Sequence, residues 1–168
     1  MRSKFAAAGV SLALVILAAT VASAAKPNFT GAWALDASKS EGVMPEAKET
    51  MTVKQDGDKF EIDRKMTTPR GERTSNDVFT ADGKESDFVR RMGPNEAKGK
   101  RSAKWSADGS TLEIGEKLTF TTQQGEERTV ESSSKWTLSA DGKTLTVEQK
   151  GGFGPRGPQD SKRIYTKQ

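Results

Sequence analysis

The 168-residue sequence contains no cysteine and no histidine. Without cysteine, the chain forms no disulfide and has neither a thiol nucleophile nor a thiolate metal ligand. Without histidine, it has no Ser-His-Asp triad and no histidine-ligated zinc or haem. The spacing of the remaining carboxylates, serines and lysines selects no catalytic arrangement. We therefore expect that the protein is not an enzyme and that it carries no metal and no cofactor.

Long hydrophobic runs are also scarce, with one exception at the N-terminus. There, Arg2 and Lys4 precede an apolar stretch that ends in small residues. This order is typical of a secretory signal peptide, here cleaved after Ala24 or Ala25. An uncleaved anchor is the alternative, because the apolar run approaches the roughly 17 residues that span a bilayer. The prediction is a signal peptide over residues 1–24, a periplasmic or secreted location, and no membrane span after cleavage.

Neither sign of charge dominates. The chain has 27 lysines and arginines against 23 acids, and removal of residues 1–24 takes away two basic residues and no acid, which leaves a net charge of +2. So small an excess does not favour a nucleic-acid partner, and export makes one still less expected. Residues 25–168 are enough for one domain with a hydrophobic core, which we expect to be monomeric.

What the chain does contain is a succession of short segments in which apolar and polar residues alternate. No stretch of ten or more residues keeps a helical period, so the pattern indicates strands. About ten are predicted, over residues 29–35, 49–55, 59–66, 73–80, 85–91, 101–107, 111–121, 128–138, 144–149 and 162–167. The stretch GGFGPRGP, residues 151–158, is predicted as a flexible connection before the last strand.

Asp-Gly pairs explain how these strands are connected. Such pairs stand between predicted strands at residues 56–57, 82–83, 108–109 and 141–142, twice within the repeated phrase SADG. Glycine accepts the positive φ that a tight hairpin needs, and aspartate tolerates it. Consecutive hairpins form a meander, which leaves two exposed edges unless it closes. We predict an all-β fold, an up-and-down antiparallel meander closed into a barrel of about ten strands; a two-sheet sandwich is the alternative.

Motifs at both ends of this region resemble a known superfamily. The first predicted strand reads FTGAWAL from Phe29, the next hairpin reads VKQDGD from Val53, and the last strand contains Arg163-Ile164-Tyr165. These motifs are similar to those of the calycins, which comprise lipocalins and fatty-acid-binding proteins, and most of all to the latter. The phrase LDASKS, residues 35–40, is similar to small exported bacterial lipocalin-like proteins. The resemblance implies a barrel that binds a small molecule without transforming it.

The resemblance also implies candidate ligand-binding residues. Arg163 and Tyr165 would turn into the barrel near Trp33, where a guanidinium and a phenol can bind an anion together. Alternatively, Arg163 only covers Trp33 through a cation–π contact and Tyr165 fills the barrel. No second clamp arginine stands in the stretch containing Ser134 and Trp136, so the family's carboxylate clamp is incomplete. The lid segment, residues 36–48, contains glycine and proline, which predicts a short or absent lid.

Alternation along the strands adds two inward charges. Arg64 shares a face with Phe60 and Ile62, and Glu116 shares a face with Ile114. Since a buried charge needs a partner, Arg64 and Glu116 either neutralise one another or line a polar pocket. The full set of predicted ligand-binding residues is Trp33, Arg64, Glu116, Ser134, Trp136, Arg163 and Tyr165.

Two hypotheses of function follow. The first is an exported lipocalin-like protein that binds a small apolar or amphiphilic ligand, with an anionic group as one option. The second is a ligand-free envelope or extracellular interaction module, whose barrel is filled by side chains. In the second, the basic stretch from Arg90 to Lys104 makes the contact. A cavity inside the barrel distinguishes the two.

Overall fold

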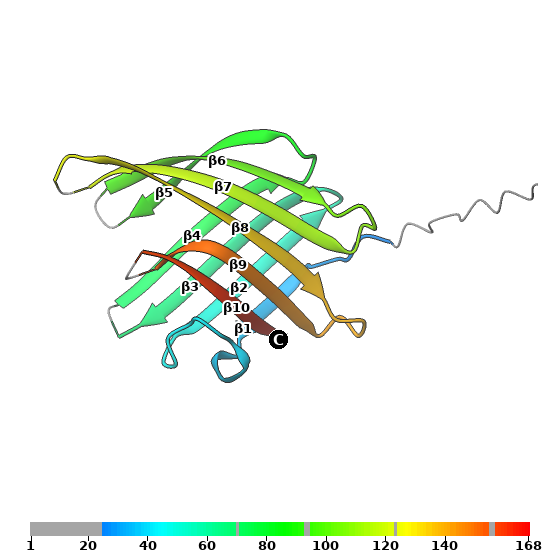
Figure 1. The fold of residues 1–168 in the computed structure, drawn as a ribbon. Coiled ribbons are helices and arrows are strands. Elements are labelled where there is room, and N and C mark those ends of the chain that lie inside the picture. The colour runs from blue at the N-terminus through cyan, green and yellow to red at the C-terminus, as the bar shows by residue number, and fades with distance from the viewer. Residues whose placement is uncertain (1–24, 70, 93–94, 123, 155–156) are drawn as a thin grey trace, which may run out of the picture.

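The computed structural model describes residues 25–69, 71–92, 95–122, 124–154 and 157–168 (Figure 1). The predicted signal peptide, residues 1–24, lies outside the described residues. The strands are β1 (Gly31–Leu35), β2 (Lys48–Asp56), β3 (Lys59–Thr68), β4 (Gly71–Thr80), β5 (Glu85–Met92), β6 (Asn95–Trp105), β7 (Thr111–Thr121), β8 (Glu127–Leu138), β9 (Thr144–Gly154) and β10 (Gly157–Lys167). One short 3₁₀ helix, η1 (Ala37–Lys39), follows β1. In this part of the chain, no helix is long and apolar enough to cross a membrane.

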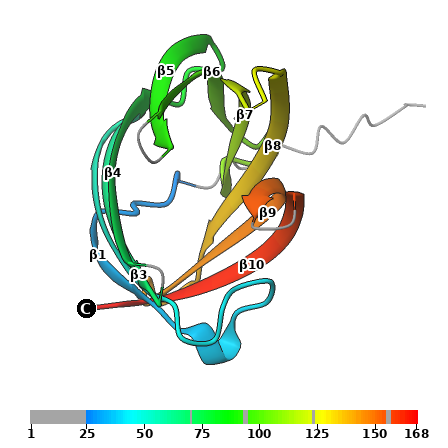
Figure 2. The same cartoon turned by 90° about the vertical axis from the view of Figure 1, so that its left-hand side faces the viewer.

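The strands form one antiparallel sheet of ten strands in the order β4-β3-β2-β1-β10-β9-β8-β7-β6-β5. The first and last strands pair, with Leu35 opposite Tyr165, so the sheet curves round on itself (Figure 2). The strands β4 and β5 are the two edges, and no pairing between them occurs among the described residues. The predicted all-β meander is therefore confirmed, as a barrel that is nearly closed.

The four Asp-Gly turns behave as predicted. Their glycines have φ of 58°, 78°, 76° and 69°, a region in which side chains are strained. The repeated phrase SADG builds the same turn twice: Ser106 donates to Asp108 and accepts from the backbone of Thr111, and the second copy repeats these bonds. The hydroxyls of Ser106 and Ser110 lower the pKa of Asp108 to about 2. The repeat is a structural turn and places no side chain in the barrel.

The glycine-rich stretch after Gln149 differs from the prediction. We expected a flexible connection, but β9 continues to Gly154 and β10 begins at Gly157, with a register shift between Gln159 and Ser161. Gly151 has φ of 67°, and a Cβ there would lie 2.5 Å from a backbone oxygen of β8. Glycine therefore lets the hairpin of β9 and β10 extend alongside β8. The sequence did not predict this extension, because glycines show no alternation of apolar and polar side chains.

The connection from β1 to β2 lies against the last strand. After η1, Glu41 exchanges two backbone hydrogen bonds with Lys162, and the Ser40 hydroxyl accepts from the backbone of Ile164. With a helix of three residues, this connection matches the predicted short lid.

One end of the barrel interior is filled by aromatic side chains. Phe29 is fully buried, stacks on Trp105 with ring centroids 6.0 Å apart, and meets Trp136 edge-on at 6.0 Å. Gly31, with φ of 147°, turns the chain so that the Phe29 carbonyl accepts a hydrogen bond of 2.9 Å from the Trp33 indole. This geometry explains the Gly-x-Trp motif and places the aromatic core at one end of the barrel, so that the other end of the interior stays free of it.

Candidate ligand-binding site

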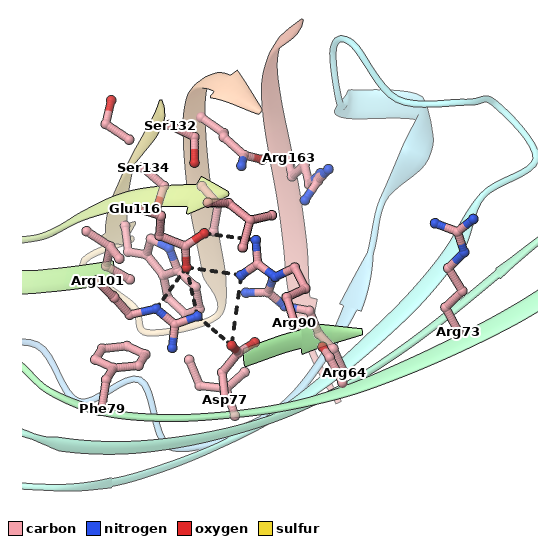
Figure 3. A pocket seen from close by; sticks show the side chains of 18 of the residues that line it. Arg64, Arg73, Asp77, Phe79, Arg90, Arg101, Glu116, Ser132, Ser134 and Arg163 are labelled. Carbon is pink, nitrogen blue, oxygen red and sulfur yellow. Dashed lines mark hydrogen bonds and ion pairs between the residues drawn. The ribbon is translucent and has the colours of Figure 1, made fainter. Parts of the chain in front are cut away.

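The other end of the interior holds a cavity of about 500 Å³. Its floor is apolar and consists of Ile62, Phe79, Ile114, Leu118, Trp136 and Val147. Its charged lining contains six arginines, Arg64, Arg73, Arg90, Arg91, Arg101 and Arg163, but two acids, Asp77 and Glu116. Figure 3 labels all of these residues except Arg91. Inward and outward residues alternate along a strand, so adjacent strands bring these side chains to a common space.

Four of these residues form the ion-pair network, defined as Asp77, Arg90, Arg101 and Glu116. Both terminal nitrogens of Arg90 donate to the Glu116 carboxylate, at 3.0 and 3.1 Å. The Nε of Arg101 donates to the same carboxylate at 2.8 Å, and its terminal nitrogen reaches Asp77. Two cations thus face two anions, so the network neutralises itself.

Aromatic rings fix the most buried member of the ion-pair network. The Arg101 side chain is 4% exposed, and its guanidinium lies 5.2 Å from the Phe79 ring centroid and 4.4 Å from that of Phe88. Phe88 takes this position because Gly99 leaves room: a Cβ there would lie 2.5 Å from the ring. Cation–π contacts with both rings hold Arg101 in one orientation.

The carboxylates of the network stay ionised in spite of burial. Burial opposes the charge on Glu116, but the guanidiniums of Arg90 and Arg101 outweigh it and lower its pKa. Asp77 follows the same balance: burial raises its pKa, while Arg101 contributes most to a net lowering. The network therefore keeps its charges at neutral pH.

A second buried cluster lies between the cavity and the core. The Tyr165 hydroxyl donates to Glu49 at 2.9 Å, and burial together with Glu49 raises the pKa of Tyr165 well above its usual value. The Nε of Arg64 lies 3.6 Å from the same carboxylate, and its guanidinium lies 5.6 Å from the Trp136 ring centroid. Glu49 therefore holds Tyr165 by a hydrogen bond and Arg64 by charge alone.

Three arginines of the lining remain incompletely compensated, and we call them the open arginines: Arg64, Arg73 and Arg163. The Nε of Arg64 is buried without a hydrogen-bond partner. Within the described part of the chain, neither Arg73 nor Arg163 forms an ion pair. Figure 3 shows Arg73 and Arg163 apart from the dashed contacts of the ion-pair network.

The structure brings five of the seven predicted residues to the cavity: Arg64, Glu116, Ser134, Trp136 and Arg163. Trp33 and Tyr165 belong instead to the buried core. The predicted pairing of Arg163 with Tyr165 does not form, because the phenol donates to Glu49. The cation over Trp33 is not Arg163 but Lys167, at 5.4 Å from the ring centroid.

Of the two alternatives for Arg64 and Glu116, mutual neutralisation does not occur, and both residues line the cavity. Glu116 pairs with Arg90 and Arg101, and Arg64 with Glu49. Glu49 and Arg101 went unrecognised although their strands carry a signal. Glu49 shares its face of β2 with buried Met51, and Arg101 shares its face of β6 with buried alanines. Part of the basic stretch from residue 90 to 104 therefore turns into the barrel.

The fold and the site define a nearly closed, ten-stranded antiparallel barrel with an arginine-rich interior. Among solved structures, the chain is similar to zebrafish ileal bile acid-binding protein complexed with cholic acid, at 19% identity, TM-score 0.50, 83% coverage of this chain and 98% of that one. It is also similar to a secretory abundant heat soluble (SAHS) protein from Ramazzottius varieornatus, at 13% identity, TM-score 0.50, 83% coverage of this chain and 94% of that one. No family model and no curated protein sequence matches the chain. These similarities establish the fold.

Proposed function

We propose that this protein binds a small anionic amphiphile inside its barrel and releases it unchanged. The observation that carries the proposal is the charge imbalance around a cavity with an apolar floor: six arginines face two acids. Glu49, beside Arg64, and Glu96, beside Arg91, raise the acids to four and leave an excess of two positive charges. Uncompensated charge in a partly buried site is unfavourable, and an anion from solvent relieves it.

The residue types suit this role. Arginine keeps its charge at every physiological pH and presents a planar fork that matches carboxylate, sulfate and phosphate oxygens. The apolar floor, which includes Ile114 and Trp136, offers a surface on which a hydrocarbon part can be buried. A volume of about 500 Å³ lies within the range usual for small-molecule sites. Cholic acid, in the complex of the zebrafish protein, is itself an amphiphilic acid.

The proposal includes the environment of the protein. Residues 1–24 act as an export signal, and the barrel of residues 25–168 works as a monomer in the periplasm or outside the cell. No nucleic acid and no catalytic step is involved. The alternative of an interaction module required a barrel filled by side chains, whereas a cavity of about 500 Å³ remains.

The test is titration of the mature protein with ligands that share one hydrocarbon tail and differ in head charge: octyl sulfate, octanol and octyltrimethylammonium. Calorimetry gives the affinity, and the fluorescence of Trp136 at the cavity floor reports occupancy. We expect one molecule of octyl sulfate per chain and much weaker binding of the other two. Equal binding of all three ligands, or none, would contradict the proposal.

A matched pair of variants locates the binding. Arg163→Gln removes one positive charge from the lining, and Arg128→Gln removes one from an exposed side chain that pairs with Glu126. We expect Arg163→Gln to weaken octyl sulfate binding by about tenfold or more, the range for a charged hydrogen bond. Arg128→Gln should leave the affinity unchanged, since that arginine is absent from the lining.

A further inference from the structure

We infer that the open arginines form a binding site for a doubly charged oxyanion, which we call the dianion seat. The preferred ligand is then a phosphate monoester of an apolar alcohol. This inference deepens the proposed function and rests on it. It names the head group that the charge distribution and the donors of the cavity select. A singly charged amphiphile would use the same cavity less well.

The first step is the division of charge inside the cavity. The ion-pair network is internally neutral, because Arg90 and Arg101 already donate to Glu116. The positive excess therefore concentrates on the open arginines, of which Arg64 shares its charge with Glu49. Two full charges, on Arg73 and Arg163, remain without a carboxylate within the described residues. A single carboxylate would neutralise one of them, and a dianion would neutralise both.

The second step is the arrangement of the walls. On the wall formed by β3 and β4, Arg64 is directly opposite Ser75, with Arg73 two residues further along. On the wall formed by β8, β9 and β10, Ser134 is opposite Gln149. Arg163 is opposite Val147, which lies two residues before Gln149 on β9. All of these residues line the one cavity. Each wall thus offers arginine together with a neutral hydrogen-bonding side chain.

The third step is the number of donors. Within the described residues, the side chains of Ser132, Ser134 and Gln149 form no hydrogen bond, although they line the cavity. Hydroxyls and an amide add directional donors to the guanidinium forks. A phosphate monoester dianion has three terminal oxygens that share its two charges and can accept from both walls, whereas a carboxylate has two oxygens in one plane.

The fourth step makes the inference testable by pH. The positive lining consists of arginine alone, and the chain has no histidine. The facing carboxylates, Asp77 and Glu116, have lowered pKa values, and the pKa of Tyr165 behind them is raised. Between pH 5 and pH 8, Asp77 and Glu116 therefore stay ionised and Tyr165 stays neutral. A phosphate monoester gains its second charge near pH 6, so a change of affinity in this range reports the ligand.

The experiment is calorimetric titration of the mature protein at pH 5 and pH 8 with octyl phosphate, octyl sulfate and inorganic phosphate. We expect octyl phosphate to bind about tenfold or more tightly at pH 8 than at pH 5, as a second set of charged hydrogen bonds forms. Octyl sulfate, which stays singly charged, should bind equally at both values. Inorganic phosphate should bind more weakly than octyl phosphate, because it leaves the apolar floor unused.

Each other outcome has a defined meaning. Octyl phosphate and octyl sulfate binding with the same affinity at both pH values would overturn the dianion seat and leave the proposed function intact. No binding of either alkyl anion would overturn the proposed function itself. Inorganic phosphate binding as tightly as octyl phosphate would support the seat but overturn the amphiphile as its occupant.

Two variants test the seat directly. Arg73→Gln and Arg163→Gln should each abolish most of the gain between pH 5 and pH 8, while Arg128→Gln should retain it. Arg73 lies on the exposed part of the edge strand β4, so its replacement does not threaten folding. If folded Arg73→Gln and Arg163→Gln kept the full increase in octyl phosphate affinity between pH 5 and pH 8, other residues would bind the second charge of the ligand. This result would overturn the inference.

Discussion

At one end of the barrel interior, Phe29 packs against Trp105 and Trp136, and at the other end six arginines and two carboxylates surround a cavity. Strands β3, β6 and β8 contribute side chains to both ends, whereas Phe29 precedes β1. Along β3, the inward side chain changes from Phe60 to Ile62 to Arg64 as the strand crosses from the aromatic core to the cavity. The comparison separates the residues that hold the barrel together from those that remain available to a ligand.

The charged end is itself divided. Arg101 is enclosed by two aromatic rings and two carboxylates, and so it contributes to the structure although it lines the cavity. Arg73 and Arg163 have no such partners within the described chain. An arginine in a cavity is therefore not by itself a binding residue; its state of compensation decides which role it plays.

The largest effect on stability is expected at the aromatic end. Phe29→Ala should lower the free energy of unfolding by about 4 kcal/mol, because it removes a fully buried ring that touches Trp105 and Trp136. Urea unfolding followed by tryptophan fluorescence measures the change. The control is Val78→Ala on the outer face of β4, where the side chain is 68% exposed and a change within about 0.5 kcal/mol is expected. Similar losses for both variants would contradict the assignment of Phe29 to the core.

Breaking the ion-pair network should come next. Glu116→Gln leaves Arg90 and Arg101 partly buried beside a neutral amide, and we expect a loss of about 3 kcal/mol. Urea unfolding provides the measurement. Adding Arg90→Gln should recover part of the loss, since it removes one of the two positive charges that lost their carboxylate partner. Additive losses in the double variant would mean that the pair is not coupled.

Acid should weaken the same network by a smaller amount. Because the folded-state pKa values of Asp77 and Glu116 lie below their ordinary values of 3.8 and 4.5, their contribution to stability is complete above those values and lost as pH falls below them. Unfolding experiments between pH 7 and pH 2 should show this decline. NMR titration of the Glu116 carboxyl carbon provides the direct check: a midpoint at or above 4.5 would refute the proposed compensation by Arg90 and Arg101.

The smallest effect on stability is expected at the open arginines. Arg73→Gln removes a charge that has no ion-pair partner in the described chain, so the free energy of unfolding should change by no more than about 0.5 kcal/mol. The same variant should weaken octyl sulfate binding by about tenfold. Calorimetry and urea unfolding of one preparation give both values. A large loss of stability would mean that Arg73 belongs with the structural arginines.

Local patterns account for the successful predictions. The Asp-Gly turns and the alternation around Phe60 and Ile62 predicted the meander. The same alternation predicted that Arg64 and Glu116 point inward, and both residues line the cavity. These features depend on residues within one strand or one hairpin, which a sequence displays directly. The glycine-rich end of β9 was missed because it has no side chains to alternate.

The partners of the inward charges could not be predicted in the same way. Glu116 lies beside Arg101 on the neighbouring strand, but Arg90 reaches it from a strand further away. Tyr165 meets Glu49 across 116 positions of sequence, through the closure of β1 onto β10. The sequence alone determined the strands, their turns and the face that each side chain takes, since these follow from local φ, ψ and alternation. Only the curvature and closure of the barrel decided which charges neutralise one another and which stay open, because Coulomb interactions depend on distances that the tertiary structure sets.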